Sequence, residues 1–336
     1  MPLLVRLLHH KDENVHVLSV ASLVNYTLNN PVMKNLVMAG KAALAATNFL
    51  TSPNMDLVKH ACLLLYNCSK TEQYRQTIAS YGAINHLIEL IRPAAAPPIY
   101  HNLQVLTNAV AVLSNLAQDS RLRGKIVGAL GFEPDPAALL RSPYSSRGVT
   151  LAASNAWSPT RSANSIPAVY IVLADLLKRD APVGVAASIK SASGPGKGSN
   201  AAASIDNDDR DDDSDTIDAA GALSMLHFRI IQTLKNLAVR IPSAATSTNE
   251  ANKRSMRFVL PSIIGFLDEI GDEHIVHIVL ELIYVLCFDP ILRRDLFNEY
   301  NLDLKIRDLF SSEADGLKKI ISDLRRLKQQ LDISGS

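Results

Sequence analysis

The chain is short of aromatic residues and of long apolar runs. Aromatic residues make up 5% of its 336 residues, with a single tryptophan, although 47% of the chain is hydrophobic. The core must therefore be built from Leu, Ile, Val and Ala, a composition that suits helices packed in layers. No apolar run reaches the roughly 18 residues of a membrane-spanning helix, so membrane contact is not expected.

Cysteine is scarce as well. Cys62, Cys68 and Cys287 are too few for a disulfide framework and lack the close pairing of a zinc site. The N-terminus reaches charged residues too early for a secretory signal. This cysteine usage is typical of a reducing compartment. We therefore expect an intracellular, cytoplasmic protein, with the nucleus or the cytoskeleton as alternatives.

The net charge of +1 gives no reason to expect a nucleic-acid partner. The balance is uneven, however, because residues 206–218 hold eight aspartates and one arginine, while the rest of the chain holds 33 basic and 25 acidic residues. This acidic tract is either a solubilising spacer or a tethered segment at high local concentration. In the second case it would mask Lys59, Arg229 and Lys235 until an acidic partner displaces it.

One phrase recurs along the chain, a hydrophobic helical stretch that ends in asparagine. Asn25 and Asn67 are 42 residues apart, and Asn67 and Asn115 are 48 residues apart. A glycine follows each of the three (Gly40, Gly82 and Gly131), and a fourth copy of the phrase ends at Asn236. These steps are near the roughly 40–47 residues of stacked helical repeats. We expect each glycine to supply a left-handed exit from one helix before the next begins.

Between the repeat asparagines and glycines, the apolar residues recur with the period of an α-helix. Ile84, Leu87, Ile88 and Ile91 form one stripe of a helix after Gly82. Similar segments start at Pro2, Pro167 and Pro261, where proline at a first helical turn costs nothing.

The segment 82–91, Gly-Ala-Ile-Asn-His-Leu-Ile-Glu-Leu-Ile, followed by 111–117, Ala-Val-Leu-Ser-Asn-Leu-Ala, resembles the armadillo repeat. The resemblance implies an all-α fold, a right-handed α-α superhelix (armadillo-type solenoid) with three helices per repeat. We assign repeats one to five to 1–30, 31–72, 73–118, 119–240 and 249–290, and a final irregular unit to 291–331. Val285 stands where the fifth asparagine is expected.

The fourth repeat is interrupted. Residues 141–165 and 181–218 lack the apolar residues needed to offset the entropy of ordering, so we expect long disordered insertions there. The expected organisation is repeats one to three and the start of repeat four in 1–140, a repeat-four helix in 166–180, and the remaining repeats with a C-terminal cap in 219–331.

Both ends of the chain invite a hypothesis. Met1 falls at the opening of a second helix, so either upstream residues are missing or this open edge packs on another chain. At the other end, residues 312–331 form a basic amphipathic helix with Lys318, Lys319, Arg325, Arg326 and Lys328 on one face. It is either a solvated capping helix or a contact for lipid or a partner.

No constellation of residues points to catalysis. Gly194–Ser199 lacks the strand and the Gly-Lys-Ser/Thr ending of a phosphate loop. His274, His277 and Glu281 share a helical face, but no further ligands stand opposite them, so no metal or cofactor is expected. We therefore expect no enzyme activity and no small-molecule substrate.

The resemblance implies instead that the asparagines face a concave groove, where their amides bind the backbone of a partner segment. The alternative is that each amide only ties down a loop. No tryptophan precedes the asparagines by one helical turn, which argues against a receptor for nuclear-localisation signals. The expected groove is lined by Asn25, Lys59, Asn67, Asn115, Arg229, Gln232, Asn236, His277, Glu281 and Tyr284.

The sequence thus predicts a non-enzymatic, intracellular scaffold that binds a protein segment, extended or helical, in an armadillo groove. A second hypothesis is a docking subunit of a cytoskeletal or axonemal assembly that packs through its open N-terminal repeat edge.

Overall fold

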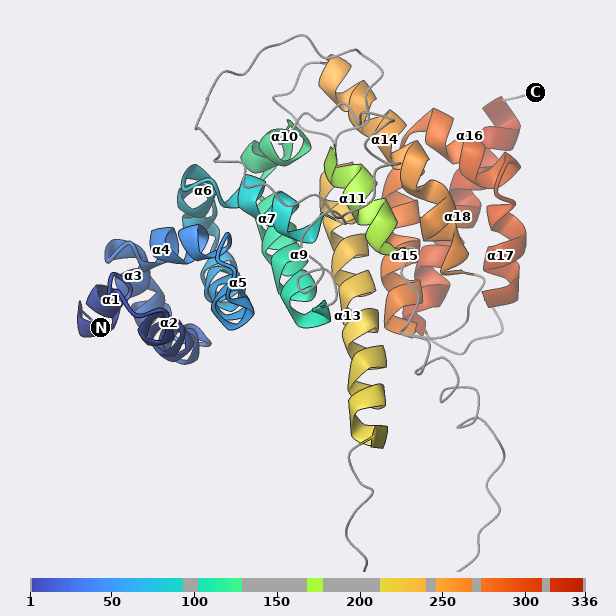
Figure 1. Ribbon diagram of the computed structural model, residues 1–336. Coiled ribbons are helices and arrows are strands. Elements are labelled where there is room, and N and C mark those ends of the chain that lie inside the picture. The colour runs from blue at the N-terminus through green and yellow to red at the C-terminus, as the bar shows by residue number, and fades with distance from the viewer. Residues whose placement is uncertain are drawn as a thin grey trace, which may run out of the picture.

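In the computed structural model the chain forms a row of stacked helices with the two termini at opposite ends (Figure 1). The structure describes residues 2–92, 102–128, 168–177, 212–239, 246–267, 273–309 and 315–334. Within these ranges every regular element is an α-helix.

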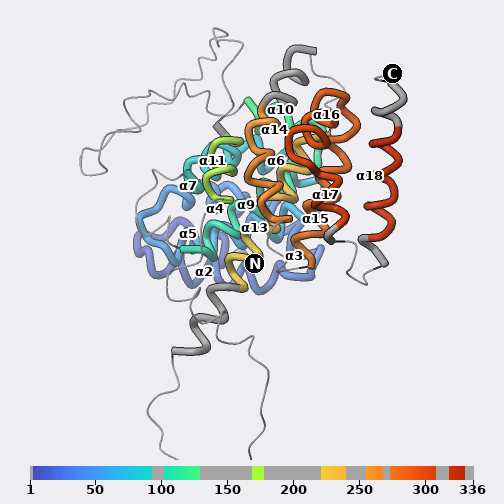
Figure 2. Tube along the Cα trace, turned by 90° about the vertical axis from the view of Figure 1, so that its right-hand side faces the viewer, coloured from blue at the N-terminus to red at the C-terminus, as the bar shows by residue number. Residues whose placement is uncertain are grey.

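The described helices group into successive units along the row. The first unit holds α1 (Pro2–Leu7) and α2 (Glu13–Thr27). Three helices make up each of the next units, namely α3 (Pro31–Ala39), α4 (Ala42–Phe49) and α5 (Met55–Ser69), then α6 (Glu72–Ser80), α7 (Ala83–Ile91) and α9 (Leu103–Gln118), then α10 (Ser120–Gly128), α11 (Ala168–Leu177) and α13 (Asp212–Ala238). The C-terminal units are α14 (Thr246–Gly265) with α15 (Glu273–Leu286), then α16 (Pro290–Asn298), α17 (Leu302–Leu309) and α18 (Asp315–Ser334). Figure 2 views the row from its C-terminal end, with α18 at one side.

The last helix of each unit forms the spine of the row. α2 packs on α5, α5 on α9, α9 on α13, and α13 on α15, and α18 then packs on α15 (Figure 1). We call α2, α5, α9, α13 and α15 the third helices. The most extensive of these contacts joins α9 to α13, although 119–211 lie between them in sequence. The fourth unit therefore continues the stack across its long interruption.

The core runs along this spine and is aliphatic, as the composition predicts. In α9 every residue from Ala109 to Ala117 is buried. A helix that is apolar on all sides belongs at the centre of a protein. Alanine and serine at positions 109, 111, 114 and 117 leave room for neighbouring helices to pack closely against α9.

Polar residues fix where the third helices begin. Asp12, Asn54 and Asn102 precede α2, α5 and α9, and each side chain accepts hydrogen bonds from backbone N–H groups of the first turn. Such N-caps satisfy donors that have no partner inside the helix.

Arginines fix where two third helices end. The Arg75 guanidinium donates to the Ser69 and Lys70 carbonyls at the C-terminal end of α5, and Arg123 donates to the Ala117 and Gln118 carbonyls at the C-terminal end of α9. A cation is favourable at the negative C-terminal end of a helix. Each arginine lies eight residues after the repeat asparagine, as does Arg293 after Val285. This spacing is a mark of the repeat that the asparagine and glycine pattern alone did not reveal.

The predicted stripe of α7 is confirmed, because Ile84, Leu87, Ile88 and Ile91 are all buried. The expected role of the glycines is only partly right. Gly82 has φ of 87°, in the left-handed region. Gly40 has φ of −79°, and Lys41 takes the left-handed conformation instead, with φ of 59°. Gly131 lies outside the described residues.

Pro261 does not begin a helix, contrary to the sequence-based expectation. It lies inside α14, which joins the segments expected to form two helices. Inside a helix proline removes one hydrogen bond and its ring crowds the carbonyl four residues earlier, so α14 continues through the exposed Pro261 at a cost that its flanking turns offset. Of the expected insertions, 141–165 and most of 181–218 lie outside the described residues. The last part of the acidic tract, 212–218, belongs to α13 and is helical.

Candidate protein-binding face

One side of the third helices α2, α5, α13 and α15 is less buried than the other. In α5 the residues that are not fully buried include Lys59, Leu63 and Tyr66, and Lys70 follows just beyond the helix; this is a single helical stripe. The same stripe on the other third helices defines what we call the third-helix face. Its members by unit are Val17, Ala21, Val24 and Leu28; Lys59, Leu63, Tyr66 and Lys70; Thr107, Ala111, Ser114 and Gln118; Phe228, Gln232, Lys235 and Val239; and His277, Glu281, Tyr284 and Phe288.

Side chains of two third helices meet across α9. Arg229 of α13 donates through its Nη2 to the Tyr66 hydroxyl of α5 at 3.1 Å, so side chains of α5 and α13 meet although α9 lies between those helices. On α9 itself, Ala111 and Ser114 are 3% and 1% exposed. The Tyr66 and Arg229 side chains therefore bridge α5 and α13 across a helix whose own residues in this stripe are closed to solvent.

The repeat asparagines connect neighbouring units. The Asn67 amide donates to the Val24 carbonyl at 3.2 Å and to Thr27 Oγ1 at 3.3 Å, at the end of the preceding third helix. Asn115 donates to Ser69 Oγ at 2.9 Å, and Asn236 donates to the Ser114 carbonyl at 3.0 Å. The acceptors lie in the preceding third helices α2, α5 and α9, so these three bonds join one unit to the next.

The asparagines differ in exposure. Asn67 is 1% and Asn115 9% exposed, Asn236 is half-buried, and Asn25 is exposed at the end of α2. A buried amide that already donates inside the protein would have to break those bonds to reach a partner. The role of the asparagines toward a partner stays a prediction. The hydrogen bonds assign Asn67, Asn115 and Asn236 to holding the face in shape.

The remaining predicted residues lie on or beside the third-helix face. Lys59, Arg229, Gln232 and His277 are half-buried along the face or at its edge. Lys235 Nζ lies 2.7 Å from Glu281 Oε2 and links α13 to α15. In α15 the repeat position of the asparagine is occupied by Val285. Tyr284 packs edge-on against Phe288, with ring centroids 5.1 Å apart.

Tyr66 and Lys70 are among the residues of this face that were absent from the expected groove. Lys70 Nζ lies 4.3 Å from the centroid of the Tyr66 ring, a cation–π contact. Both could have been found from spacing, since they continue the stripe of Lys59 by seven and eleven residues.

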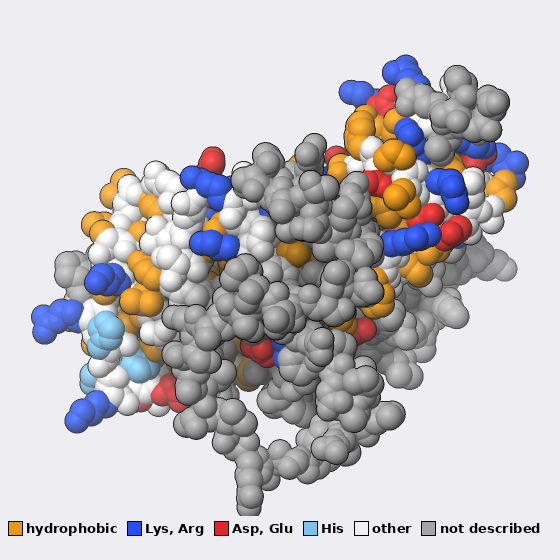
Figure 3. Space-filling model, turned by 90° about the horizontal axis from the view of Figure 1, so that it is seen from above, with side chains coloured by type: hydrophobic (Ala, Val, Ile, Leu, Met, Phe, Trp, Pro, Cys, Tyr) orange, Lys and Arg blue, Asp and Glu red, His pale blue; other side chains and the backbone are white. Residues whose placement is uncertain are grey.

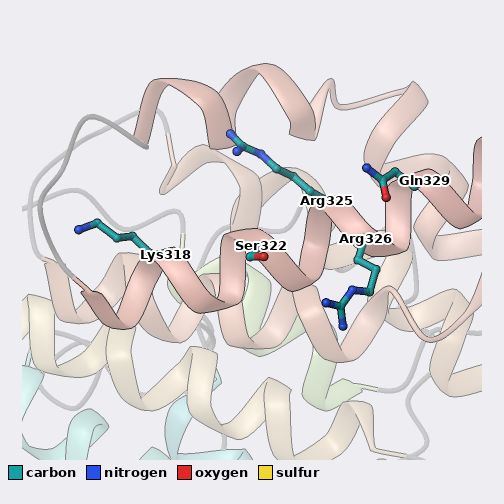
Figure 4. Close-up of a pocket in the computed structure, with 5 residues that line it drawn as sticks. All are labelled: Lys318, Ser322, Arg325, Arg326 and Gln329. Carbon is teal, nitrogen blue, oxygen red and sulfur yellow. The ribbon is translucent and has the colours of Figure 1, made fainter.

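A second polar surface lies on α18. Lys318, Ser322, Arg325, Arg326 and Gln329 project from this helix and line a shallow hollow of about 370 Å³ (Figure 4). Figure 3 shows Lys and Arg side chains interspersed with hydrophobic ones over the C-terminal end of the row. Lys328 is paired with Asp303 of α17 at 2.8 Å. This helix is anchored to the solenoid by Ile321 and Leu324, which are buried.

The cysteines are poorly suited to act as nucleophiles. All three are buried as free thiols, and burial raises the pKa of Cys62, Cys68 and Cys287 to about 12. A thiol with such a pKa is inert as a nucleophile near neutral pH. Within the described ranges no cluster of His, Cys, Asp and Glu could hold a metal ion. In the same part of the chain, no helix has the length and apolar character needed to cross a bilayer.

Comparison with known proteins places the fold. No sequence-family model and no curated protein matches the chain. A designed armadillo repeat protein matches its structure with a TM-score of 0.62 at 13% identity, covering 97% of this chain and 98% of its own. Another, in complex with the peptide (KR)4, gives 0.61 at 12% identity over 97% and 98%.

A third similar structure comes from a study of a phosphorylation switch that controls the interaction between cadherin and β-catenin. Its TM-score is 0.61 at 11% identity, covering 98% of this chain and 52% of that chain. At this level of identity the likeness concerns the fold. The chain therefore has the armadillo fold, an all-α right-handed superhelix of stacked repeats, as its repeat pattern predicts.

Proposed function

We propose that this chain is a non-enzymatic, intracellular scaffold that binds a segment of a partner protein on its third-helix face. The observation that carries the proposal is the stripe of partly exposed polar side chains on the third helices α5, α13 and α15, where Arg229 of α13 bonds to Tyr66 of α5 across α9. A half-polar surface that runs across several stacked helices suits an extended segment, whose backbone needs polar partners.

Each predicted residue has a place in this proposal. Asn67, Asn115 and Asn236 keep neighbouring third helices in register through the bonds described above. The partner contacts fall to the more exposed side chains, Asn25, Lys59, Arg229, Gln232, His277, Glu281 and Tyr284. Two of the similar structures concern protein or peptide binding by their own names, (KR)4 in one and cadherin with β-catenin in the other.

Quantitative affinity capture from lysate tests the proposal. A triple variant of the face, Lys59→Ala with Gln232→Ala and Tyr284→Ala, is compared with wild type. The control, Asn85→Ala with Lys125→Ala and Arg294→Ala, changes exposed residues on α7, α10 and α16. The proposal expects at least one partner that the control retains and the face variant loses. Equal recovery by all three proteins would remove the third-helix face from the account.

The second candidate is a docking subunit that packs through its N-terminal edge. Leu3, Leu18, Val32 and Leu36, from α1, α2 and α3, are 66%, 69%, 63% and 45% exposed. Large apolar side chains gathered at one end often mark an interface. Light scattering after size exclusion would show a complex that Leu18→Gln with Val32→Gln disrupts; a monomer with unchanged partners in both forms would count against this role.

A further inference from the structure

Two cations share one tyrosine on the third-helix face. Tyr66 lies in the last turn of α5, and its ring has Lys70 Nζ at 4.3 Å from the centroid. The guanidinium carbon of Arg229 lies 5.6 Å from the same centroid, and Arg229 Nη2 donates to the Tyr66 hydroxyl at 3.1 Å. A phenol is a neutral acceptor, and it accepts from a guanidinium that has further N–H donors to offer.

The helices around this cluster provide little negative charge. α9 has no acidic residue, and α5 has one, Asp56, in its first turn. The aspartates of α13 all lie in 212–218, at least eleven residues before Arg229, or about 16 Å along the helix axis. Among the described residues, no ion pair is found for Lys59, Lys70 or Arg229.

The neighbouring pair shows the contrast. One unit further along, Lys235 is neutralised by Glu281 at 2.7 Å. Among the described residues, cations without an ion-pair partner therefore lie on α5 or just beyond it (Lys59 and Lys70) and in the middle of α13 (Arg229), on either side of α9. The cation next to α15, Lys235, is paired with Glu281. A ligand with negative charge is attracted to the first region and finds no free cation in the Lys235–Glu281 pair.

We propose that the third-helix face around Tyr66 and Arg229 takes an acidic segment of a partner protein, and that a carboxylate of this segment replaces the Tyr66 hydroxyl as the acceptor of Arg229. This inference rests on the proposed protein-binding function and names the partner chemistry. The Arg229–Tyr66 bond has one ionised partner, whereas an Arg–carboxylate pair has two and can form two parallel N–H···O bonds, so the exchange is favourable. Lys59 and Lys70 receive neighbouring carboxylates along α5.

The contact between Arg229 and Tyr66 then acts as a latch. It joins α5 to α13 across α9 in the free protein, and a neutral segment gains too little from Arg229 to release it. Acidic partners are selected because only a carboxylate compensates the lost hydrogen bond and adds charge pairing.

Fluorescence anisotropy with defined probes tests this inference on the full chain. The probe is a labelled peptide of about twelve residues that alternates Asp and Ala, long enough to cross three helices packed about 10 Å apart. Matched peptides carry Asn, Lys or phosphoserine in place of Asp. Titrations are made at about 0.15 M salt, where distant surface charges are largely screened. The Asp peptide should bind more tightly than the Asn and Lys peptides.

Two substitutions test the charge of Arg229 and its contact with the Tyr66 hydroxyl separately. Arg229→Gln removes the cation and should weaken binding of the Asp peptide about five-fold. Tyr66→Phe removes only the hydroxyl, frees Arg229, and should strengthen binding about two- to three-fold. Arg294→Gln, an equal charge change on the exposed surface of α16, is the control and should leave affinity unchanged.

Each outcome decides a part of the inference. Equal binding of Asp and Asn peptides, preference for the Lys peptide, binding of the phosphoserine peptide alone, or an unaltered affinity in Arg229→Gln would overturn the acidic partner. Weaker binding in Arg229→Gln with no gain in Tyr66→Phe would overturn the latch. If affinity capture still depends on the face while the Asp peptide fails, the partner chemistry is wrong and the protein-binding function stands.

Discussion

At the scale of single residues, the asparagines show what the spacing of a repeated residue can predict. Their spacing predicts that they occupy equivalent places on stacked helices, and the structure puts three of them in equivalent bonds between units. Spacing gives the face of a helix and leaves the bonding partner open, because an amide serves a neighbouring repeat as readily as a ligand. The partner Ser69 or Thr27 becomes visible only when the helices are stacked.

The Asn67 amide should matter for stability. Asn67→Ala is expected to lower the free energy of unfolding by about 0.5–1.5 kcal/mol, because it removes the amide that donates to the half-buried Val24 carbonyl and to the Thr27 hydroxyl. Asn25→Ala, at the equivalent but exposed position, should change it by less than about 0.5 kcal/mol. Urea unfolding followed by circular dichroism measures both. Equal effects would contradict the assignment of Asn67 as a tie between repeats.

Asp119 should make stability depend on acid pH. The side-chain hydrogen bond from Arg121 is the main cause that lowers the pKa of Asp119 to about 2, and burial opposes it. An unfolded aspartate has a pKa of about 3.9. The native protein therefore gains stability from this group above about pH 4 and loses it as the pH falls toward about 2.

Asp119→Asn isolates this contribution. Asparagine also caps a helix well, so the cap toward the Arg121 N–H is kept while the charge is removed. The difference in unfolding free energy between wild type and variant, measured in urea from pH 5 downward, should shrink below about pH 4. A difference that stays constant down to about pH 2 would show that the ion pair adds nothing.

At the scale of elements, local rules predicted helices well and their junctions less well. The stripe of α7 follows from four apolar positions that leave only one buried face. The junction after α3 depends on how the backbone turns between two packed helices. There Gly40 stays at negative φ and Lys41 takes the left-handed conformation, which a pattern of glycines cannot predict. The helix start expected at Pro261 was wrong as well, because α14 continues through this proline.

Glycine substitutions test the junction before α7. Gly82→Ala should lower the free energy of unfolding by about 1 kcal/mol, because φ is 87° and no atom lies within 4 Å of the added Cβ, so that the cost is conformational. Gly124→Ala, inside α10 and equally free of contacts, should instead raise stability by about 0.5–1 kcal/mol. Thermal unfolding compares the two; a stabilised Gly82→Ala protein would be incompatible with the described backbone.

At the scale of the whole molecule, the stack continues where the chain does not. α9 and α13 form the most extensive contact between elements, and α11 packs beside them against α13 and α14. The sequence predicted this continuity from the Leu-x-Asn-Leu-Ala phrase that returns at 234–238. It did not predict that α13 begins at Asp212, because a run of aspartates favours helix only at an N-terminus, where the macrodipole is positive.

Shortening the segment between α11 and α13 tests whether the stack of helices forms independently of that segment. Replacing 183–205 with about ten Gly and Ser residues should change the free energy of unfolding by less than about 1 kcal/mol, because loop length enters only logarithmically. Deleting α11 (Ala168–Leu177), which has seven buried residues, should destabilise the protein by several times that amount. Comparable losses in both variants would show that the connection contributes to the stack.

The central claim, that the third-helix face binds the partner, is tested most directly by site-specific photo-cross-linking in cells. A benzoylphenylalanine replaces Gln232 on the face in one protein and Asn85 on α7, away from the face, in another. The account predicts a defined covalent adduct from position 232 that disappears when Arg229→Glu is added, and none from position 85. Adducts from position 85 alone, or equal adducts from both positions, would contradict it.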